Sequence, residues 1–272
     1  MTEQPDHIQK LLDIMARLRD PENGCPWDVE QTFASIVPHT IEEAYEVAET
    51  IETGDMAALK DELGDLLFQV VFYAQMAKEA GDFDFNAVVD AVSDKMVRRH
   101  PHVFADAHIE DAEAQTAAWE DQKQQERSNV NGNADIDGPA ASALDGVITA
   151  LPALTRAFKL QKRAARVGFD WPTLGSVIGK VREELAEVEA EIDEADPERL
   201  TDELGDLMFC CVNLARKLEI DAETALRGGN AKFERRFRRM EVLLADDGMG
   251  FKDMPVDDVL DKYWTQAKRE ET

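Results

Sequence analysis

The feature that most constrains this chain is a pair of short acidic segments that occurs twice. In the second half the pair is Glu183-Glu184-Leu185-Ala186-Glu187 and Asp202-Glu203-Leu204-Gly205-Asp206. In the first half it is Glu42-Glu43-Ala44-Tyr45-Glu46 and Asp61-Glu62-Leu63-Gly64-Asp65. The interval between the two segments is the same in both halves, and each second segment runs directly into apolar sequence. A duplicated pair at fixed spacing indicates an internal repeat.

If these segments are helical, each one turns its carboxylates to a single face. Side chains three or four residues apart on a helix are neighbours, and like charges at that spacing oppose helix formation unless a positive charge lies between them. Two such helices that face each other would surround one point with carboxylate oxygens, the environment that Mg²⁺ binds together with water and phosphate. A solvated acidic surface is the simpler interpretation of any single segment. It does not explain a repeat at fixed spacing.

The apolar periodicity predicts helices along the whole chain, and no strand-like alternation competes with them. The helix that carries the first acidic segment is expected to start near Pro38 and to end at Gly54, and Asp55 is expected to cap the next helix. In the second half, a helix over residues 177–194 is followed by an aspartate and a proline at 196–197, which are typical of a helix start. The predicted fold class is all-α, with tandem duplicated units that resemble four-helix bundles.

The composition changes between the two halves. Residues 128–139 are small, polar or turn-forming and have almost nothing to bury, which is typical of a flexible linker. We therefore expect an N-terminal helical domain over residues 1–127, a linker over 128–142 and a C-terminal helical domain over 143–272.

Each half continues into a basic helix and then an aromatic residue. In the second half this helix is expected over residues 230–240, with Lys232 and Arg236 on one face. Its first-half counterpart is the segment Lys95-x-x-Arg98-Arg99. The tryptophans that align after these helices are Trp119 and Trp264.

The charge of the chain limits its partners. With 30 basic and 57 acidic residues the formal net charge is −27, which argues against a nucleic-acid polymer or an anionic membrane as the main partner. A small anionic ligand is compatible with this charge if metal ions lie between it and the protein. We expect no membrane-spanning segment and no signal peptide. The three cysteines form no zinc or disulfide pattern, so we expect a cytoplasmic protein.

Carboxylates and basic residues together indicate phosphate chemistry. Carboxylates hold Mg²⁺, the metal neutralises phosphate oxygens, and Lys or Arg binds the remaining phosphate charge. The expected reaction is hydrolysis of a phosphoanhydride. A helical di-iron site would need Glu-x-x-His pairs, and none of the five histidines is in such a position. The alternative function is a non-catalytic acidic helical scaffold or partner-binding module.

These residues resemble the signature of the MazG-type nucleoside triphosphate pyrophosphohydrolases, which belong to the all-α NTP pyrophosphatases. The match is Glu-Glu-x-x-Glu, a spacer, and then Glu-x-x-Asp. It extends through flanking stretches over nearly the whole chain, namely residues 19–28, 98–104 and 161–165. The resemblance implies Mg²⁺-dependent cleavage of a nucleoside triphosphate between its α and β phosphates, with the C-terminal unit active in two-domain members.

The resemblance also implies roles for individual residues. It implies metal ligands at Glu184, Glu187, Glu203 and Asp206. It implies nucleotide contacts from Lys180, Glu183, Glu184, Glu187, Lys232, Arg236 and Trp264. Glu183 is the candidate catalytic residue as a general base, although the sequence leaves open which carboxylate has that role. Three other interpretations also stay open. In these, Lys180 only forms an ion pair within its helix, Lys232 and Arg236 lie on an exposed helix without binding nucleotide, and Trp264 is a core residue.

The first half departs from this pattern at two places. It keeps the four acidic positions Glu43, Glu46, Glu62 and Asp65, but His39 stands where the second half has Lys180, and Pro101 cuts the basic helix short. We therefore expect an auxiliary first domain. Since each half offers only about four substantial helices and the helix over residues 204–214 is very apolar, we also expect a homodimer that binds nucleoside triphosphates.

Overall fold

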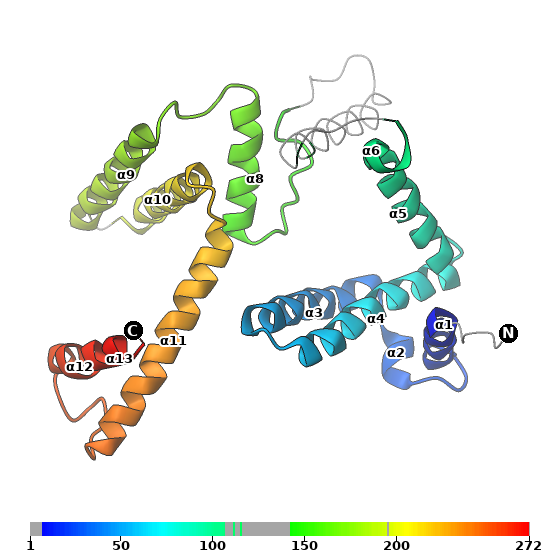
Figure 1. Cartoon of the computed structure of the whole chain (residues 1–272), viewed down its shortest axis with the longest axis horizontal. Helices are drawn as coiled ribbons and strands as arrows, with labels where there is room; N and C mark the ends of the chain where they lie inside the picture. Colours follow the sequence, from blue (N-terminus) through cyan, green and yellow to red (C-terminus); the bar gives the residue numbers. More distant parts are fainter. Residues whose placement is uncertain (1–6, 107–110, 112–114, 116–141, 195, 272) are drawn as a thin grey trace. The chain divides into compact units, whose positions relative to one another are not determined.

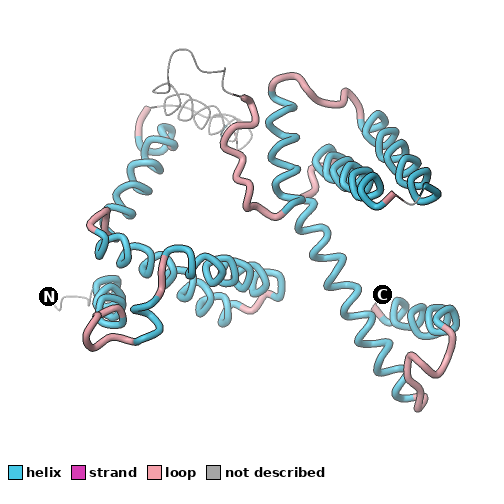
Figure 2. Tube along the Cα trace, turned by 180° about the vertical axis from the view of Figure 1, so that it is seen from behind, coloured by secondary structure: helices cyan, strands magenta, loops and turns pink. Residues whose placement is uncertain are grey.

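A computed structural model describes residues 7–106, 111, 115, 142–194 and 196–271 of the 272-residue chain. This part of the chain is helical and contains no strand, as Figures 1 and 2 show, so the predicted all-α class is confirmed. The chain divides into two compact units, residues 1–125 and 126–272. The expected linker over residues 128–142 lies outside the described residues except for its last position, and so does Trp119. The domain boundaries stay a prediction.

The first unit is organised around a helical hairpin. The hairpin consists of α3 (Phe33–Thr53) and α4 (Met56–Ala80), which pack against each other. Gly54 has the left-handed conformation that ends α3, with φ of 72°, and the Asp55 side chain accepts the first backbone N–H groups of α4. Both predicted caps are therefore correct. The other helices of this unit are α1 (His7–Leu18), α2 (Pro26–Glu30), α5 (Phe85–Arg99) and α6 (Pro101–Phe104).

The expected start of α3 near Pro38 is wrong, because the helix begins at Phe33. Thr32 and Ser35 form a capping box in which each side chain accepts the backbone N–H of the other residue. Pro38 lies inside the helix, close to its start. The cap therefore sets the first turn.

The core of the first unit lies between α1, α3 and α4. Its buried members are Met15, Ile36, Val71, Phe72 and Met76. Arg19, just beyond α1, ties this core to α2 and α4, since its side chain bonds to the Asp28 carbonyl and to the Glu79 carboxylate. The first unit thus has an apolar centre directly behind the α3–α4 hairpin.

The second unit repeats the hairpin with α9 (Leu174–Glu194) and α10 (Pro197–Lys217), and α8 (Ala153–Arg166) packs against α10. Asp196 caps α10 and Pro197 is its first residue, as predicted. The start of α9 is three residues earlier than the expected residue 177, because the Thr173 side chain accepts from the Ser176 backbone N–H.

The rest of the second unit extends from a long helix. α11 (Ala222–Asp246) is much longer than the predicted basic helix over 230–240, because Asp221 caps it at a point well before the basic residues begin. Figure 1 shows α12 (Val256–Val259) and α13 (Thr265–Glu270) beside the far half of α11. A π-helix, η1 (Leu260–Trp264), joins these two helices. The buried residues there are Met240, Leu243, Leu244, Val259 and Tyr263. None of the described helices combines the length and apolar character that crossing a bilayer requires.

Candidate metal and nucleotide site

The α9–α10 hairpin brings three carboxylates of the second unit together. Glu184 and Glu187 lie one turn apart on α9, and Glu203 lies on α10. Each contributes an oxygen, and these three oxygens lie within 4.8 Å of one another. The two acidic segments recognised in the sequence therefore face each other across the hairpin, because the helical spacing aligns each set on one side.

One lysine balances part of this negative charge. The Lys180 Nζ lies 2.7 Å from Glu183 Oε1 and 2.6 Å from Glu184 Oε1. Its hydrogen bonds to these two carboxylates raise the pKa of Lys180 above its ordinary value. The lysine therefore stays charged and holds both glutamates on the side of α9 that carries the trio.

The remaining charge of the trio is poorly compensated. Glu184 is 4% exposed, and its Oε2 is buried without a hydrogen-bond partner among the described residues. The pKa of Glu187 is raised, first by removal from water and then by hydrogen bonding to, and repulsion from, Glu184. A buried carboxylate oxygen that lacks a donor is costly. An oxygen-only set of this kind fits a hard divalent cation.

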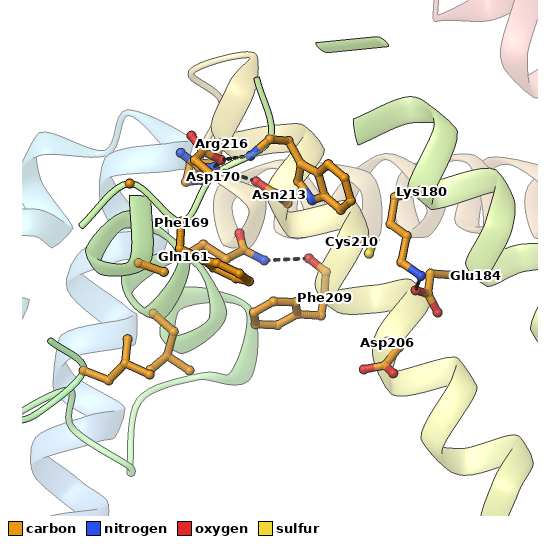
Figure 3. A pocket seen from close by; sticks show the side chains of 15 residues that line it. Gln161, Phe169, Asp170, Lys180, Glu184, Asp206, Phe209, Cys210, Asn213 and Arg216 are labelled. Carbon is orange, nitrogen blue, oxygen red and sulfur yellow. Dashed lines mark hydrogen bonds and ion pairs between the residues drawn. The ribbon is translucent and has the colours of Figure 1, made fainter. Parts of the chain in front are cut away.

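A cavity of about 720 Å³ opens beside the trio. Its walls come from α8, α9, α10 and the turn that follows α8. Lys180, Glu184 and Asp206 line it, so the fourth predicted ligand lies next to the trio without belonging to it. Figure 3 shows these three side chains at one end of the cavity and Gln161, Asp170 and Arg216 at the other.

The polar residues at the second end were not predicted as site residues, although Gln161 belongs to the stretch 161–165 that carries the family resemblance. They are Gln161 on α8, Asn213 and Arg216 on α10, and Asp170 in the turn after α8. The signal for them was weak: Asn213 is a single amide within the apolar stretch of α10. Only the packing of α8 on α10 brings Gln161 to the same cavity.

The predicted basic and aromatic residues lie elsewhere in this unit. The Arg236 Nε donates to Glu271 Oε2 at 2.6 Å, and its guanidinium carbon lies 6.0 Å from the centre of the Trp264 ring. Trp264 also packs against Phe233 on α11. Neither these residues nor Lys232 lines the cavity. The structure therefore brings Arg236 and Trp264 together, but apart from the trio.

The first unit has a similar carboxylate group. Oxygens of Glu43, Glu62 and Asp65 lie within 4.8 Å of one another, and Glu46 lies outside this trio. Removal from water and the neighbouring carboxylates raise the pKa values of Glu43 and Glu62. At the position of Lys180, the first unit has His39, whose Nδ1 lies 3.8 Å from Glu42 Oε2.

The duplication also appears when the chain is compared with known proteins. The sequence profile of the MazG nucleotide pyrophosphohydrolase domain matches residues 31–104 and again residues 173–240, which contain the two hairpins. The chain belongs to the MazG family. A nucleoside triphosphate pyrophosphohydrolase of Escherichia coli K12 is 52% identical to this MazG chain over 268 residues, 98% of each chain.

More distant relatives give the same picture. The nucleoside triphosphate pyrophosphohydrolase/pyrophosphatase MazG of Thermotoga maritima is 42% identical over 262 residues, 96% of this chain and 95% of its own. The uncharacterised protein YabN of Bacillus subtilis is 43% identical over 259 residues, 95% of this chain and 51% of its own. The family assignment and the tandem all-α arrangement expected from the sequence are therefore confirmed.

Proposed function

We propose that this chain is a Mg²⁺-dependent nucleoside triphosphate pyrophosphohydrolase whose second unit is active. It cleaves the α–β phosphoanhydride to give a nucleoside monophosphate and pyrophosphate, as part of nucleotide-pool housekeeping. The observation that carries the proposal is the trio of Glu184, Glu187 and Glu203 beside a cavity of nucleotide size. The names of the E. coli and T. maritima relatives support the same reaction.

The acidic end of the cavity would hold the metal. Glu184, Glu187 and Glu203 are the ligands we propose, with Asp206 next to them at the cavity wall. The partnerless Glu184 Oε2 fits this role because a cation would satisfy it. When bound, Mg²⁺ supplies charge neutralisation for phosphate oxygens and lowers the pKa of a bound water.

The residues around the trio have separate tasks in the proposal. Lys180 keeps Glu184 oriented and binds a phosphate oxygen, since it already lies between carboxylates at the cavity wall. Glu183 is held by Lys180 through Oε1, which leaves Oε2 to accept a proton from the attacking water as the general base. The water oxygen then bonds to the α-phosphorus, the bond from that phosphorus to the α–β bridging oxygen breaks, and pyrophosphate leaves.

A second copy of the chain completes the proposal. Both helices of the second hairpin expose large apolar side chains, including Leu185, Ile192, Leu204 and Met208. A homodimer that buries them would explain this exposure. Lys232, Arg236 and Trp264 do not line the cavity of their own chain. In a homodimer, the second copy would supply its basic helix and these residues to the site. Light scattering that shows a monomer at micromolar concentration would contradict the dimer.

The activity is tested with matched variants in the two units. Pyrophosphate release from a panel of ribo- and deoxyribonucleoside triphosphates is measured while Mg²⁺ is titrated. Glu187→Gln is expected to lose about a hundredfold or more in kcat/KM, because a missing ligand misplaces the metal and the α-phosphate. Glu46→Gln, at the equivalent position of the first unit, is expected to change little.

Two results would contradict the proposal. A wild-type protein that releases no pyrophosphate from any substrate would favour the scaffold interpretation. Glu187→Gln with wild-type kinetics would instead show that the metal site is assigned to the wrong residues. Thermal melts with and without Mg²⁺ accompany the kinetics, since the variant is expected to keep its fold.

A further inference from the structure

The end of the cavity away from the trio has chemistry that the proposed hydrolysis does not use. Figure 3 shows Gln161 and Asn213 there, with the Phe169 and Phe209 rings beside Gln161. Phe169 is 82% exposed and Trp171, which also lines the cavity, is 41% exposed. Aromatic rings around two amides form a surface suited to a flat, polar-edged molecule.

Gln161 presents a hydrogen-bond acceptor to this end. The side chain is 6% exposed, and its Nε2 donates to the Phe209 backbone carbonyl at 2.8 Å. A carbonyl can only accept, so the nitrogen must face Phe209 and Oε1 must face the other way. This Oε1 is buried and has no partner among the described residues. An acceptor left unsatisfied in this way indicates a missing donor.

Asn213 presents a donor. The side chain is 8% exposed, and its Oδ1 accepts from Arg216 Nη2 at 2.7 Å. An arginine can only donate, so Oδ1 must face Arg216 and Nδ2 is directed elsewhere. Asp170 holds the Arg216 guanidinium in place through an ion pair, and Lys217 Nζ lies 2.6 Å from Asp170 Oδ2. The orientation of the Asn213 amide is therefore set by charged groups behind it.

We infer that Gln161 and Asn213 bind the hydrogen-bonding edge of the nucleobase, between the Phe169, Trp171 and Phe209 side chains. The inference rests on the proposed function, since the triphosphate would then extend toward Lys180 and Glu184 at the acidic end. Asp170 and Arg216 are positioning residues for Asn213. The base would lie in this cavity, which the Trp264 side chain of the same chain does not line.

The wild-type amide pair is compatible with several bases, and one substitution is expected to narrow that choice. One acceptor and one donor match any base edge that has a donor next to an acceptor, and adenine, cytosine, guanine and uracil each have one. Asn213→Asp keeps the oxygen that Arg216 needs and replaces the donor by an acceptor. Two acceptors match adjacent donors, which only guanine offers, through its N1–H and N2–H₂ groups.

The test compares GTP and ATP as substrates of the full chain. For Asn213→Asp, the ratio of kcat/KM for GTP to that for ATP is expected to rise at least tenfold over wild type. The control is Asn86→Asp, an exposed residue at a separate hollow of the first unit, which is expected to leave the ratio unchanged. A second measurement uses wild type with purine riboside triphosphate, which lacks the exocyclic donor of ATP and is expected to be a weaker substrate by about tenfold.

An unchanged ratio in Asn213→Asp would overturn the inference, and so would equal use of ATP and the purine riboside analogue by wild type. If wild type releases no pyrophosphate from any substrate, the proposed function fails separately. In that case the affinities of wild type and Asn213→Asp for AMP and GMP, measured by calorimetry without metal, decide the inference. A GMP preference that appears only in the variant would support it, and identical affinity ratios would overturn it.

Discussion

The two units have the same acidic hairpin and differ in what lies behind it. When the hairpins are aligned on Asp65 and Asp206, Phe72 of the first unit corresponds to Asn213 of the second. Phe72 is 1% exposed and belongs to an apolar core with Met15. Asn213 lines a cavity of about 720 Å³. The two carboxylate trios are therefore alike, whereas the space next to them differs: the second unit has a cavity there and the first has a packed core.

The basic residue beside the carboxylate trio also differs between the two units. Lys180 is a permanent cation that contacts two glutamates of the second unit. The first unit has His39 at that position, near Glu42 and edge-on to the Trp27 ring. Lys180 contacts two carboxylates at 2.7 and 2.6 Å, whereas His39 approaches one carboxylate at 3.8 Å. These two differences are the reason why we propose the second unit, and not the first, as the nucleotide-binding one.

The largest effect is expected for Phe72, in the packed core of the first unit. Phe72→Ala should destabilise the first unit by about 3–5 kcal/mol, because it leaves a cavity in a filled core. Asn213→Ala should cost much less, about 1 kcal/mol, because its side chain already borders a hollow. Urea unfolding, with hydrogen exchange to assign each transition to a unit, measures both. Equal losses would mean that the two positions are packed alike.

The next largest effect is expected when a bulky side chain fills the cavity of the second unit. Asn213→Phe copies the first-unit residue into the cavity and should lower kcat/KM for every nucleoside triphosphate by about tenfold or more, because substrate can no longer take its place. Asn86→Phe, at an exposed position of the first unit, is the control. Wild-type kinetics in Asn213→Phe would mean that nucleotide binds outside this cavity.

Structural features that depend only on neighbouring residues could be predicted from the sequence. The glutamates of each segment align because they lie within one or two helical turns, and the caps at Gly54, Asp55 and Asp196 depend only on neighbouring residues. The capping box of Thr32 and Ser35 is also a local feature, but it was not part of the prediction, which placed the helix start near Pro38.

Features that depend on packing could not be predicted. Nothing in the sequence around Gln161 indicates that α8 will bring it to Asn213, because the two residues are far apart in the chain. The same holds for Arg236, whose helix is long and carries it to Glu271 and Trp264 rather than to the trio. The pattern of charges identified the basic helix, but its direction is set by tertiary contacts.

The smallest expected effect is a pH-dependent one, in the second unit alone. Burial by itself would raise the pKa of Asp170, but hydrogen bonds from Arg216 and Lys217 and their charges lower it below the ordinary 3.8. The ionised carboxylate therefore stabilises the fold above the ordinary pKa of aspartate, and this contribution is lost as the pH falls through the lowered pKa.

Asp170→Asn should accordingly reduce the stability of the second unit by about 1 kcal/mol at pH 7. The difference from wild type should shrink as the pH falls below about 4. Denaturant unfolding at several pH values measures it. A difference that is constant with pH would mean that the ion pair is not its cause.

A crystal structure with Mg²⁺ and an α,β-methylene nucleoside triphosphate, whose α–β bridge cannot be hydrolysed, would locate the metal, the phosphates and the base together. We expect metal at Glu184, Glu187 and Glu203, the phosphates next to Lys180, and the base between α8 and α10 against Gln161 and Asn213. Nucleotide density at the first-unit trio, with the cavity of the second unit left empty, would contradict it.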